Sequence, residues 1–430
     1  MRNLLFILLL VFSYSFSFSQ KIVGDWKGNI EMNSNKIPIL FHFNKNDSGN
    51  ITGTWDSPMQ NAKDLPFTKI EVTGDSVHLD IKMIGGSYQG KFISDDSIAG
   101  MWHQNNGQIA LNFGRTAFQP DEAVHVKTKN EDQKPYPNEK EISIFSSLGA
   151  SIYGTLLSKN KDQKLAIIIP GSGPTDRNGN NPIGVNANSY KMLAHSLDSQ
   201  NIASFRFDKS FIGKSIVPGV KEEEVTFDNG IKDVENIVNY LRDTIGFKNI
   251  YLIGHSEGSL IGMVVASRKK INGYISLAGM GRSFDKVIEE QINKQGWPDS
   301  LKNRSAFILN QLKMGKVVDS VPVSLQNVFR KSVQPYLIAM LKFAPDQEIK
   351  KVHCPILILQ GNCDIQITVA DANKLHDANK KSSLEIIPGM THTLKNAGEK
   401  CADQNRTYTD SSLPLDHHLV KYISGFIQKN

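Results

Sequence analysis

Three residues in the second half of the chain have the types and the order that nucleophilic catalysis needs. Ser256 lies within Gly254-His-Ser-Glu-Gly258, which is a G-x-S-x-G pattern. A buried-strand pattern precedes the serine and a helical pattern follows it, so we expect a sharp strand-turn-helix that exposes the hydroxyl. The two glycines keep side chains out of the crowded turn. Asp364 and His392 each follow a later predicted strand, so the chain order is Ser, Asp, His.

These three residue types divide the work of acyl transfer. A serine hydroxyl is a poor nucleophile until a base takes its proton, and a carboxylate must hold that base in one tautomer. We therefore predict Ser256 as the nucleophile, His392 as the general base and then acid, and Asp364 as the residue that orients the histidine. The rival acid, Asp371, lies inside the helix predicted after Asp364, where it is less well placed to reach the site.

Acyl transfer also needs two backbone donors for the oxyanion of the tetrahedral intermediate. The amide of Glu257, the residue after the nucleophile, is expected to be one of them. We assign the other to the amide of Ser172, in the loop Pro170-Gly-Ser-Gly-Pro174 that follows a continuous apolar strand. Glycine on each side of Ser172 lets the backbone approach a ligand closely. The alternative interpretation is a plain glycine loop.

The elements that must position these residues alternate along residues 141–430. We predict strands at 141–146, 150–157, 164–170, 202–207, 250–253, 271–278, 355–360 and 383–387, and helices at 188–199, 228–244, 258–268 and 419–428. This alternation predicts an α/β fold with a doubly wound, mostly parallel sheet. Residues 280–350 contain only amphipathic helical segments, at 284–294, 305–314 and 324–343, so we expect a helical cap beside the strand ends where ligands bind.

Residues 21–117 have a different pattern, with short alternating runs between turns rich in Gly, Asn, Asp, Ser and Thr. Such runs predict a small all-β domain ahead of the hydrolytic one. Its three tryptophans, Trp26, Trp55 and Trp102, can form either a core or an aromatic binding surface, and a domain this small favours the core.

Two further segments in the first third of the chain are predicted to be a linker and a signal peptide. Residues 118–140 are dense in Asp, Glu, Lys and Pro and are predicted to be a linker. Residues 1–20 combine Arg2, an apolar run over 4–12 and a Ser/Phe-rich exit, which is typical of a secretory signal peptide and too short to span a membrane. We expect an exported protein, periplasmic or extracellular, without stable membrane insertion.

Composition and charge exclude several classes of protein and of site. The net charge of +6 is spread along 430 residues with no run of basic side chains, so we expect no nucleic-acid partner.

Cys354, Cys363 and Cys401 allow one disulfide and one free thiol, and their spacing leaves the pairing open. We expect no metal, because no Cys/His cluster has zinc-like spacing and His417-His418 is expected to be solvated. No cofactor is needed, because protein groups supply every step.

These motifs resemble the α/β-hydrolase fold superfamily, in particular secreted bacterial acyl esterases and prolyl oligopeptidase-like serine hydrolases. The resemblance covers about residues 141–430 and rests on 171–179, on Arg206-Phe-Asp208 with Gly213-Lys-Ser215, and on the three candidate residues. It implies the same triad. Related chains often place Asp-Arg-Gly after Arg-Tyr-Asp, whereas this chain has Lys209-Ser-Phe211. We expect that difference to affect the rim of the substrate pocket and not the triad. We further expect Asp176 and Arg177 to pair and to fix the oxyanion loop.

The resulting hypothesis is an acyl esterase that acts on small-molecule esters through an acyl-enzyme. The first alternative is a serine peptidase or aminopeptidase of the prolyl oligopeptidase-like type. An aminopeptidase needs acidic groups in the cap for the substrate amine, and the candidates Glu289 and Glu290 are expected to be solvated. The second alternative is a binding protein with a vestigial hydrolase, which the intact Ser, Asp and His disfavour. Acyl length and oligomeric state do not follow from the sequence.

Overall fold

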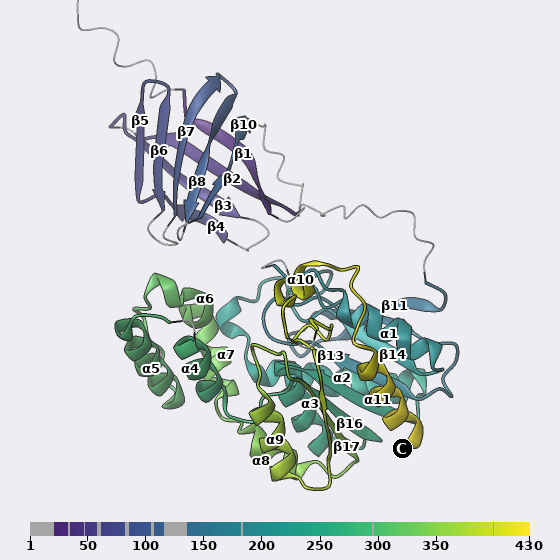
Figure 1. Cartoon of the computed structure of the whole chain (residues 1–430). Helices are drawn as coiled ribbons and strands as arrows, with labels where there is room; N and C mark the ends of the chain where they lie inside the picture. The colour runs from purple at the N-terminus through teal and green to yellow at the C-terminus, as the bar shows by residue number, and fades with distance from the viewer. Residues whose placement is uncertain are drawn as a thin grey trace, which may run out of the picture. The chain divides into compact units, whose positions relative to one another are not determined.

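The chain folds into two compact units, residues 1–132 and 133–430, and each is described by itself (Figure 1). The computed structural model describes residues 21–430 apart from 33–34, 47, 58–61, 82–85, 105–106, 116–135, 182–183, 295 and 399. The predicted signal peptide and residues 118–135 of the predicted linker lie outside this described part. The last residues of that linker, however, belong to the second unit, whose first strand begins at Glu139 rather than at Glu141.

The first unit contains a ten-stranded sheet whose strand pairs are all antiparallel. Its strands are β1 (Gly24–Met32), β2 (Asn35–Lys45), β3 (Ile51–Ser57), β4 (Ala62–Pro66), β5 (Lys69–Thr73), β6 (Ser76–Ile81), β7 (Gly86–Ser94), β8 (Ser97–Gln104), β9 (Gly107–Ala110) and β10 (Phe113–Arg115). They run in the order β4-β3-β2-β1-β10-β8-β7-β6-β5, with β9 paired to β8. The prediction of a small all-β domain is confirmed.

Aromatic side chains fill the core of this first unit. Phe41 stacks on Phe113 with ring centroids 4.1 Å apart. Trp26, Trp55 and Trp102 are 0%, 3% and 6% exposed. The tryptophans therefore form core, as predicted, and do not form an aromatic binding surface.

The second unit contains an eight-stranded sheet, mostly parallel, that carries the candidate residues. Its strands are β11 (Glu139–Phe145), β12 (Ser151–Leu157), β13 (Leu165–Ile169), β14 (Ala203–Phe207), β15 (Ile250–His255), β16 (Gly273–Leu277), β17 (Ile356–Gly361) and β18 (Ser383–Ile387). The order is β11-β12-β14-β13-β15-β16-β17-β18. Only the pairings of β11 with β12 and of β12 with β14 are antiparallel.

Helices cover both faces of this sheet, which explains its continuous apolar strands. In β15, Ile250 and Leu252 belong to one core, whereas Tyr251 and Ile253 belong to the other. Successive side chains of a strand point to opposite faces, so a strand buried on both faces must be apolar throughout. One face carries α1 (Ser189–Ser199) and α11 (His417–Lys429), and the other carries α2 (Phe227–Asn239), α3 (Glu257–Arg268) and α9 (Val369–Ala378).

The predicted cap lies between β16 and β17 and is helical. It consists of α4 (Phe284–Lys294), α5 (Asp299–Lys313), α6 (Gln326–Phe329), α7 (Gln334–Met340) and α8 (Pro345–Glu348), of which α4 to α7 form a group beside the sheet (Figure 1). The prediction of one helix over 324–343 is wrong, because the chain is extended at Arg330, with ψ at 146°. Pro335 has no amide to continue a helix, so α7 starts anew around it.

No helix in the described part of the chain is both long and apolar enough to cross a membrane.

Candidate active site

Ser256 lies at a strained turn between β15 and α3. Its backbone has φ 55° and ψ −120°, a conformation that residues other than glycine rarely adopt. The turn leaves no room beside the serine, since a Cβ at Gly254 would lie 2.3 Å from the Gly258 oxygen, and one at Gly258 would lie 2.4 Å from the Ile169 oxygen. The two glycines therefore let the strand, the turn and the neighbouring strand β13 approach closely.

Asp364 and His392 come from the loops after β17 and β18 and meet in a buried pair. His392 Nδ1 lies 2.8 Å from Asp364 Oδ2. The other carboxylate oxygen accepts the amides of Gln366 at 2.8 Å and Ile367 at 2.9 Å. Burial alone would raise the pKa of the Asp364 carboxyl, but His392 and these amides outweigh it and lower that pKa below its ordinary value. The carboxylate is thus kept ionised to orient the imidazole.

His255, the residue before the candidate nucleophile Ser256, contacts this pair. Its Nε2 lies 2.8 Å from the backbone oxygen of His392, and its Nδ1 lies 2.7 Å from the Tyr190 hydroxyl. A carbonyl only accepts, so Nε2 carries the proton and Nδ1 accepts from Tyr190. Burial, and next the proximity of His392, lower the pKa of His255 to about 3, so the ring is neutral at ordinary pH. The sequence pattern did not single out His255, because it occupies a variable position of G-x-S-x-G.

The loop with the predicted oxyanion donor Ser172 runs directly past the nucleophile. A Cβ at Gly171 would lie 3.2 Å from Ser256 Cβ, and the Gly171 amide donates to the Tyr190 hydroxyl at 3.1 Å. The second predicted donor, Glu257, is the first residue of α3, where an amide has no partner within the helix. The fold thus brings Gly171, the residue before Ser172, against Ser256, while Glu257 follows Ser256 directly.

The predicted pairing of Asp176 with Arg177 is wrong. Arg177 instead grips Asp208, with Nη2 and Nε 2.7 and 2.9 Å from Oδ2 and its backbone amide 2.8 Å from Oδ1. The Asp176 carboxylate accepts the amides of Asn178 and Asn180 within its own turn. Because the amides of its own turn already bind the Asp176 carboxylate, Arg177 binds instead to Asp208, on the loop after β14. The oxyanion loop is therefore fixed to that loop.

A further group of polar residues near the nucleophile was not predicted. Lys209 Nζ donates to the Gly171 oxygen at 2.6 Å and lies 3.8 Å from Glu257 Oε1. The same Glu257 oxygen accepts the hydroxyl of Tyr336, from cap helix α7, at 2.8 Å. The only sequence signal for Lys209 was its place directly after Arg206-Phe-Asp208.

The rival acid, Asp371, has a structural role. It is fully buried near the start of α9, where it accepts the Thr368 hydroxyl at 2.9 Å and pairs with Arg282 at 2.7 Å. Burial raises the pKa of the Asp371 carboxyl, but Arg282, the Thr368 hydroxyl and the Gly281 amide outweigh it and lower that pKa below its ordinary value. The pair ties the start of the cap to α9 and leaves Asp364 as the acid beside His392.

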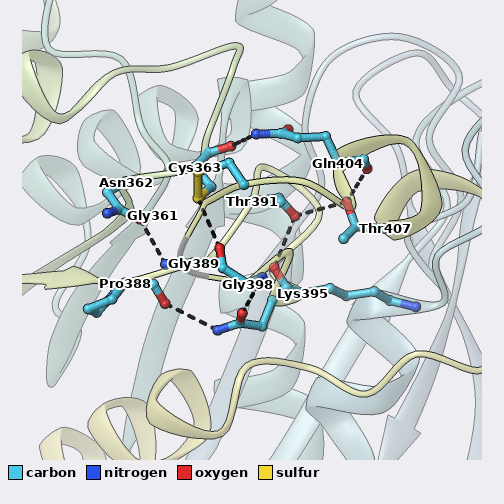
Figure 2. Close-up of a disulfide and its surroundings, with 12 residues drawn as sticks. Gly361, Asn362, Cys363, Pro388, Gly389, Thr391, Lys395, Gly398, Gln404 and Thr407 are labelled. Carbon is cyan, nitrogen blue, oxygen red and sulfur yellow. Dashed lines mark hydrogen bonds between the residues drawn. A yellow bond between two sulfur atoms is a disulfide. The ribbon is translucent and has the colours of Figure 1, made fainter.

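A disulfide joins the loop of the candidate acid to the segment beyond the candidate histidine. Cys363 and Cys401 are bonded, with their Cα atoms 5.4 Å apart (Figure 2). Cys354 is a half-buried free thiol. Cys363 directly precedes Asp364. This is the pairing that the spacing alone left open.

The segment after Cys401 contacts the loops of the candidate acid and of the candidate histidine. We call residues 401–409, which include α10 (Gln404–Thr409), the brace. The Gln404 side chain donates to the Cys363 oxygen, next to the acid. On the histidine side, the Thr407 hydroxyl lies 3.1 Å from that of Thr391 (Figure 2). The Thr393 hydroxyl donates to the Thr407 oxygen at 3.0 Å. The brace thus holds the residues that flank Asp364 and His392.

One group in the described part of the chain has the donor types of a metal site. Ligand-type atoms of Asp416, His417 and His418 lie within 4.8 Å of one another. Asp416 already caps α11 by accepting the His418 amide at 2.9 Å, and His417 is exposed while His418 is half-buried. This arrangement is accounted for by helix capping.

Comparison with known proteins places this site in a family of hydrolases. A family model described as "Serine aminopeptidase, S33" matches residues 183–399, a stretch that contains Ser256, Asp364 and His392. Esterase EstD of Thermotoga maritima is 25% identical over 217 residues, which are 48% of this chain and 47% of that protein. The match thus spans about half the length of this curated relative.

Solved esterase structures are similar at lower identity. Est1E from Butyrivibrio proteoclasticus with bound ferulic acid is 19% identical, with 67% of this chain and 96% of that chain covered and a TM-score of 0.44. The esterase Pf2001 from Pyrococcus furiosus is 14% identical, with 68% and 92% covered and a TM-score of 0.44.

Proposed function

The chain belongs to the serine aminopeptidase S33 family of α/β-hydrolases, and from that premise we propose that it cleaves carboxylic esters through an acyl-enzyme. One observation carries the proposal. The buried His392 imidazole is oriented by an ionised carboxylate 2.8 Å away, and the His392 backbone oxygen accepts from His255, the residue directly before the serine on the strained strand-to-helix turn. These are the components of an activated nucleophile.

In the proposed mechanism, Ser256 Oγ attacks the ester carbonyl while His392 Nε2 takes the hydroxyl proton. Asp364 holds the other ring nitrogen and stabilises the imidazolium that forms. The carbonyl oxygen becomes an oxyanion, and the Ser172 and Glu257 amides donate to it. The alcohol leaves with the proton from His392, and a water molecule activated by the same imidazole then releases the acid. No cofactor takes part in these steps.

The ion pairs of two carboxylates in the cap favour an ester substrate over an aminoacyl substrate. An aminopeptidase must offer an acidic group to the substrate ammonium. Glu289 is paired with Lys286 at 2.9 Å, and Glu290 is paired with Arg282 at 2.6 Å and with Lys294 at 2.5 Å. These two carboxylates already have cationic partners within the protein. The curated relative that the chain matches is also an esterase by name.

The proposal is tested by rate assays on p-nitrophenyl esters of increasing acyl length and on aminoacyl and prolyl p-nitroanilides. We expect ester turnover with little anilide turnover, and a fall in kcat of about 10⁶-fold in Ser256→Ala, because the activated nucleophile is gone. A fluorophosphonate should label Ser256 and no other serine. Ester hydrolysis that survives in a folded Ser256→Ala protein contradicts the mechanism. Anilide rates equal to ester rates would move the assignment to a peptidase.

We also propose that the protein is exported. The apolar run over 4–12 supports this, as does the Cys363–Cys401 disulfide, because such bonds persist in oxidising compartments. Expression of the full chain in a bacterium and N-terminal sequencing should give a mature protein that begins near residue 21. A product that retains residues 1–20 in the cytoplasm would refute export.

A further inference from the structure

The contacts of Lys209 are unusual for a lysine in an ion pair. Its side chain is 22% exposed, and its short contact is not to a carboxylate but to the backbone oxygen of Gly171, at 2.6 Å. The Glu257 carboxylate lies further away, at 3.8 Å. A simple structural ion pair would place the ammonium within hydrogen-bond distance of the carboxylate. The carbonyl is therefore the group that Lys209 binds directly.

The Gly171 carbonyl belongs to the same peptide unit as the amide of Ser172. A trans peptide is planar, so its C=O and N–H point in opposite directions. An ammonium that holds the oxygen on one side therefore fixes the direction of the N–H on the other side. Gly171 lies against Ser256, where a Cβ would come within 3.2 Å of the serine Cβ. Fixing this peptide unit fixes the donor beside the nucleophile.

Neighbouring contacts leave Lys209 little freedom to move away. The residue before it, Asp208, is held by three hydrogen bonds from Arg177. On its other side lies Glu257, whose own backbone amide is the second candidate donor and whose carboxylate accepts from Tyr336 at 2.8 Å. The lysine thus lies between the two residues whose amides would form the oxyanion hole.

We propose that Lys209 is a positioning residue that assembles the oxyanion hole, by holding the Gly171–Ser172 peptide unit with its N–H toward the reacting oxygen. This inference rests on the proposed function and deepens it. The positive charge also polarises the peptide, because hydrogen bonds in a chain strengthen one another, and this makes the Ser172 amide a better donor. The benefit is greatest when negative charge develops on the substrate oxygen, so it acts on the transition state more than on the bound ester.

The test compares Lys209→Met with wild type on one p-nitrophenyl ester. Methionine keeps most of the side-chain volume and removes the donor and the charge. We expect kcat to fall by about 100-fold, the loss typical of one oxyanion donor, while KM stays within about threefold. A trifluoromethyl ketone, which forms a hemiketal oxyanion on Ser256, should bind more weakly by the same factor as kcat/KM falls. A merely structural role would not move these two quantities together.

The matched control is Lys214→Met, on the same loop. Lys214 is 66% exposed and pairs with Glu141 at 2.7 Å, away from the peptide unit in question. This control should keep wild-type kcat and wild-type inhibitor affinity. If Lys209→Met does not fold, Lys209→Gln serves in its place, with a kcat loss of at least about tenfold expected from the missing charge at unchanged KM.

Two results would overturn the inference. One is a folded Lys209 variant with kcat within threefold of wild type. The other is a loss of kcat with unchanged trifluoromethyl ketone affinity. Failure of the proposed function looks different, because hydrolysis would then survive in Ser256→Ala. Failure of the Lys209 inference shows instead as Ser256-dependent hydrolysis that the Lys209 variants leave intact.

Discussion

Different interactions fix the oxyanion loop and the loops of Asp364 and His392, which we call the oxyanion side and the acid and histidine side of the site. On the oxyanion side, charged and polar side chains fix the loop, with Lys209 on the Gly171 carbonyl, Arg177 on Asp208 and Tyr190 on the Gly171 amide. On the acid and histidine side, a disulfide and a set of hydroxyl contacts from the brace fix the loops. One side depends on charged and polar side chains, and the other depends on a covalent bond together with hydroxyl contacts.

The difference follows from the length of chain that each side must order. The oxyanion loop lies in the connection between β13 and α1, residues 170–188. His392, in contrast, lies in a longer connection between β18 and α11, residues 388–416, whose described part contains the helix α10. The disulfide spans 38 residues of sequence, and a cross-link over such a loop stabilises the folded state by about 3–4 kcal/mol in the chain-entropy account. The longer connection after β18 therefore needs that constraint more than the connection after β13 does.

The largest effect that tests this comparison is expected from Asp364→Asn. The amide can no longer hold His392 as a proton acceptor in the required tautomer, so kcat should fall by about 10⁴-fold with little change in KM. Steady-state kinetics on a p-nitrophenyl ester measure this. The matched control is Asp371→Asn, on the following helix, which should lower the melting temperature through loss of the Arg282 pair but leave kcat within about threefold. Equal losses of kcat in both variants would make Asp371 as important to catalysis as Asp364.

A smaller effect is expected from the double variant Cys363→Ser, Cys401→Ser. Without the cross-link the brace holds the loops of Asp364 and His392 less firmly, so we expect kcat to fall by about tenfold and the melting temperature to drop. Cys354→Ser, which removes the free thiol, should change neither quantity. Dithiothreitol should slow the wild type and Lys209→Met by the same factor, because the two sides are held independently. A reductant effect that disappears in Lys209→Met would show that the two sides are coupled.

The sequence by itself determined the elements that depend on local patterns. The order of apolar residues and glycines around Ser256 predicted the strand, turn and helix, and a Cβ at either glycine would collide with backbone atoms. The same patterns located the strands that precede Asp364 and His392, the helical cap and the tryptophan core of the first unit. Each of these is set by residues within one turn or one strand, so a single sequence contains the information.

Only the tertiary structure decided which side chains meet. Cys363 pairs with Cys401 rather than Cys354, and Arg177 binds Asp208 rather than its neighbour Asp176. Lys209 reaches a carbonyl 38 positions before it in the chain. The order β14-β13-β15 places the loops after these three strands side by side at one edge of the sheet. Contacts between distant segments depend on that strand order, and periodicity within one segment carries no information about it.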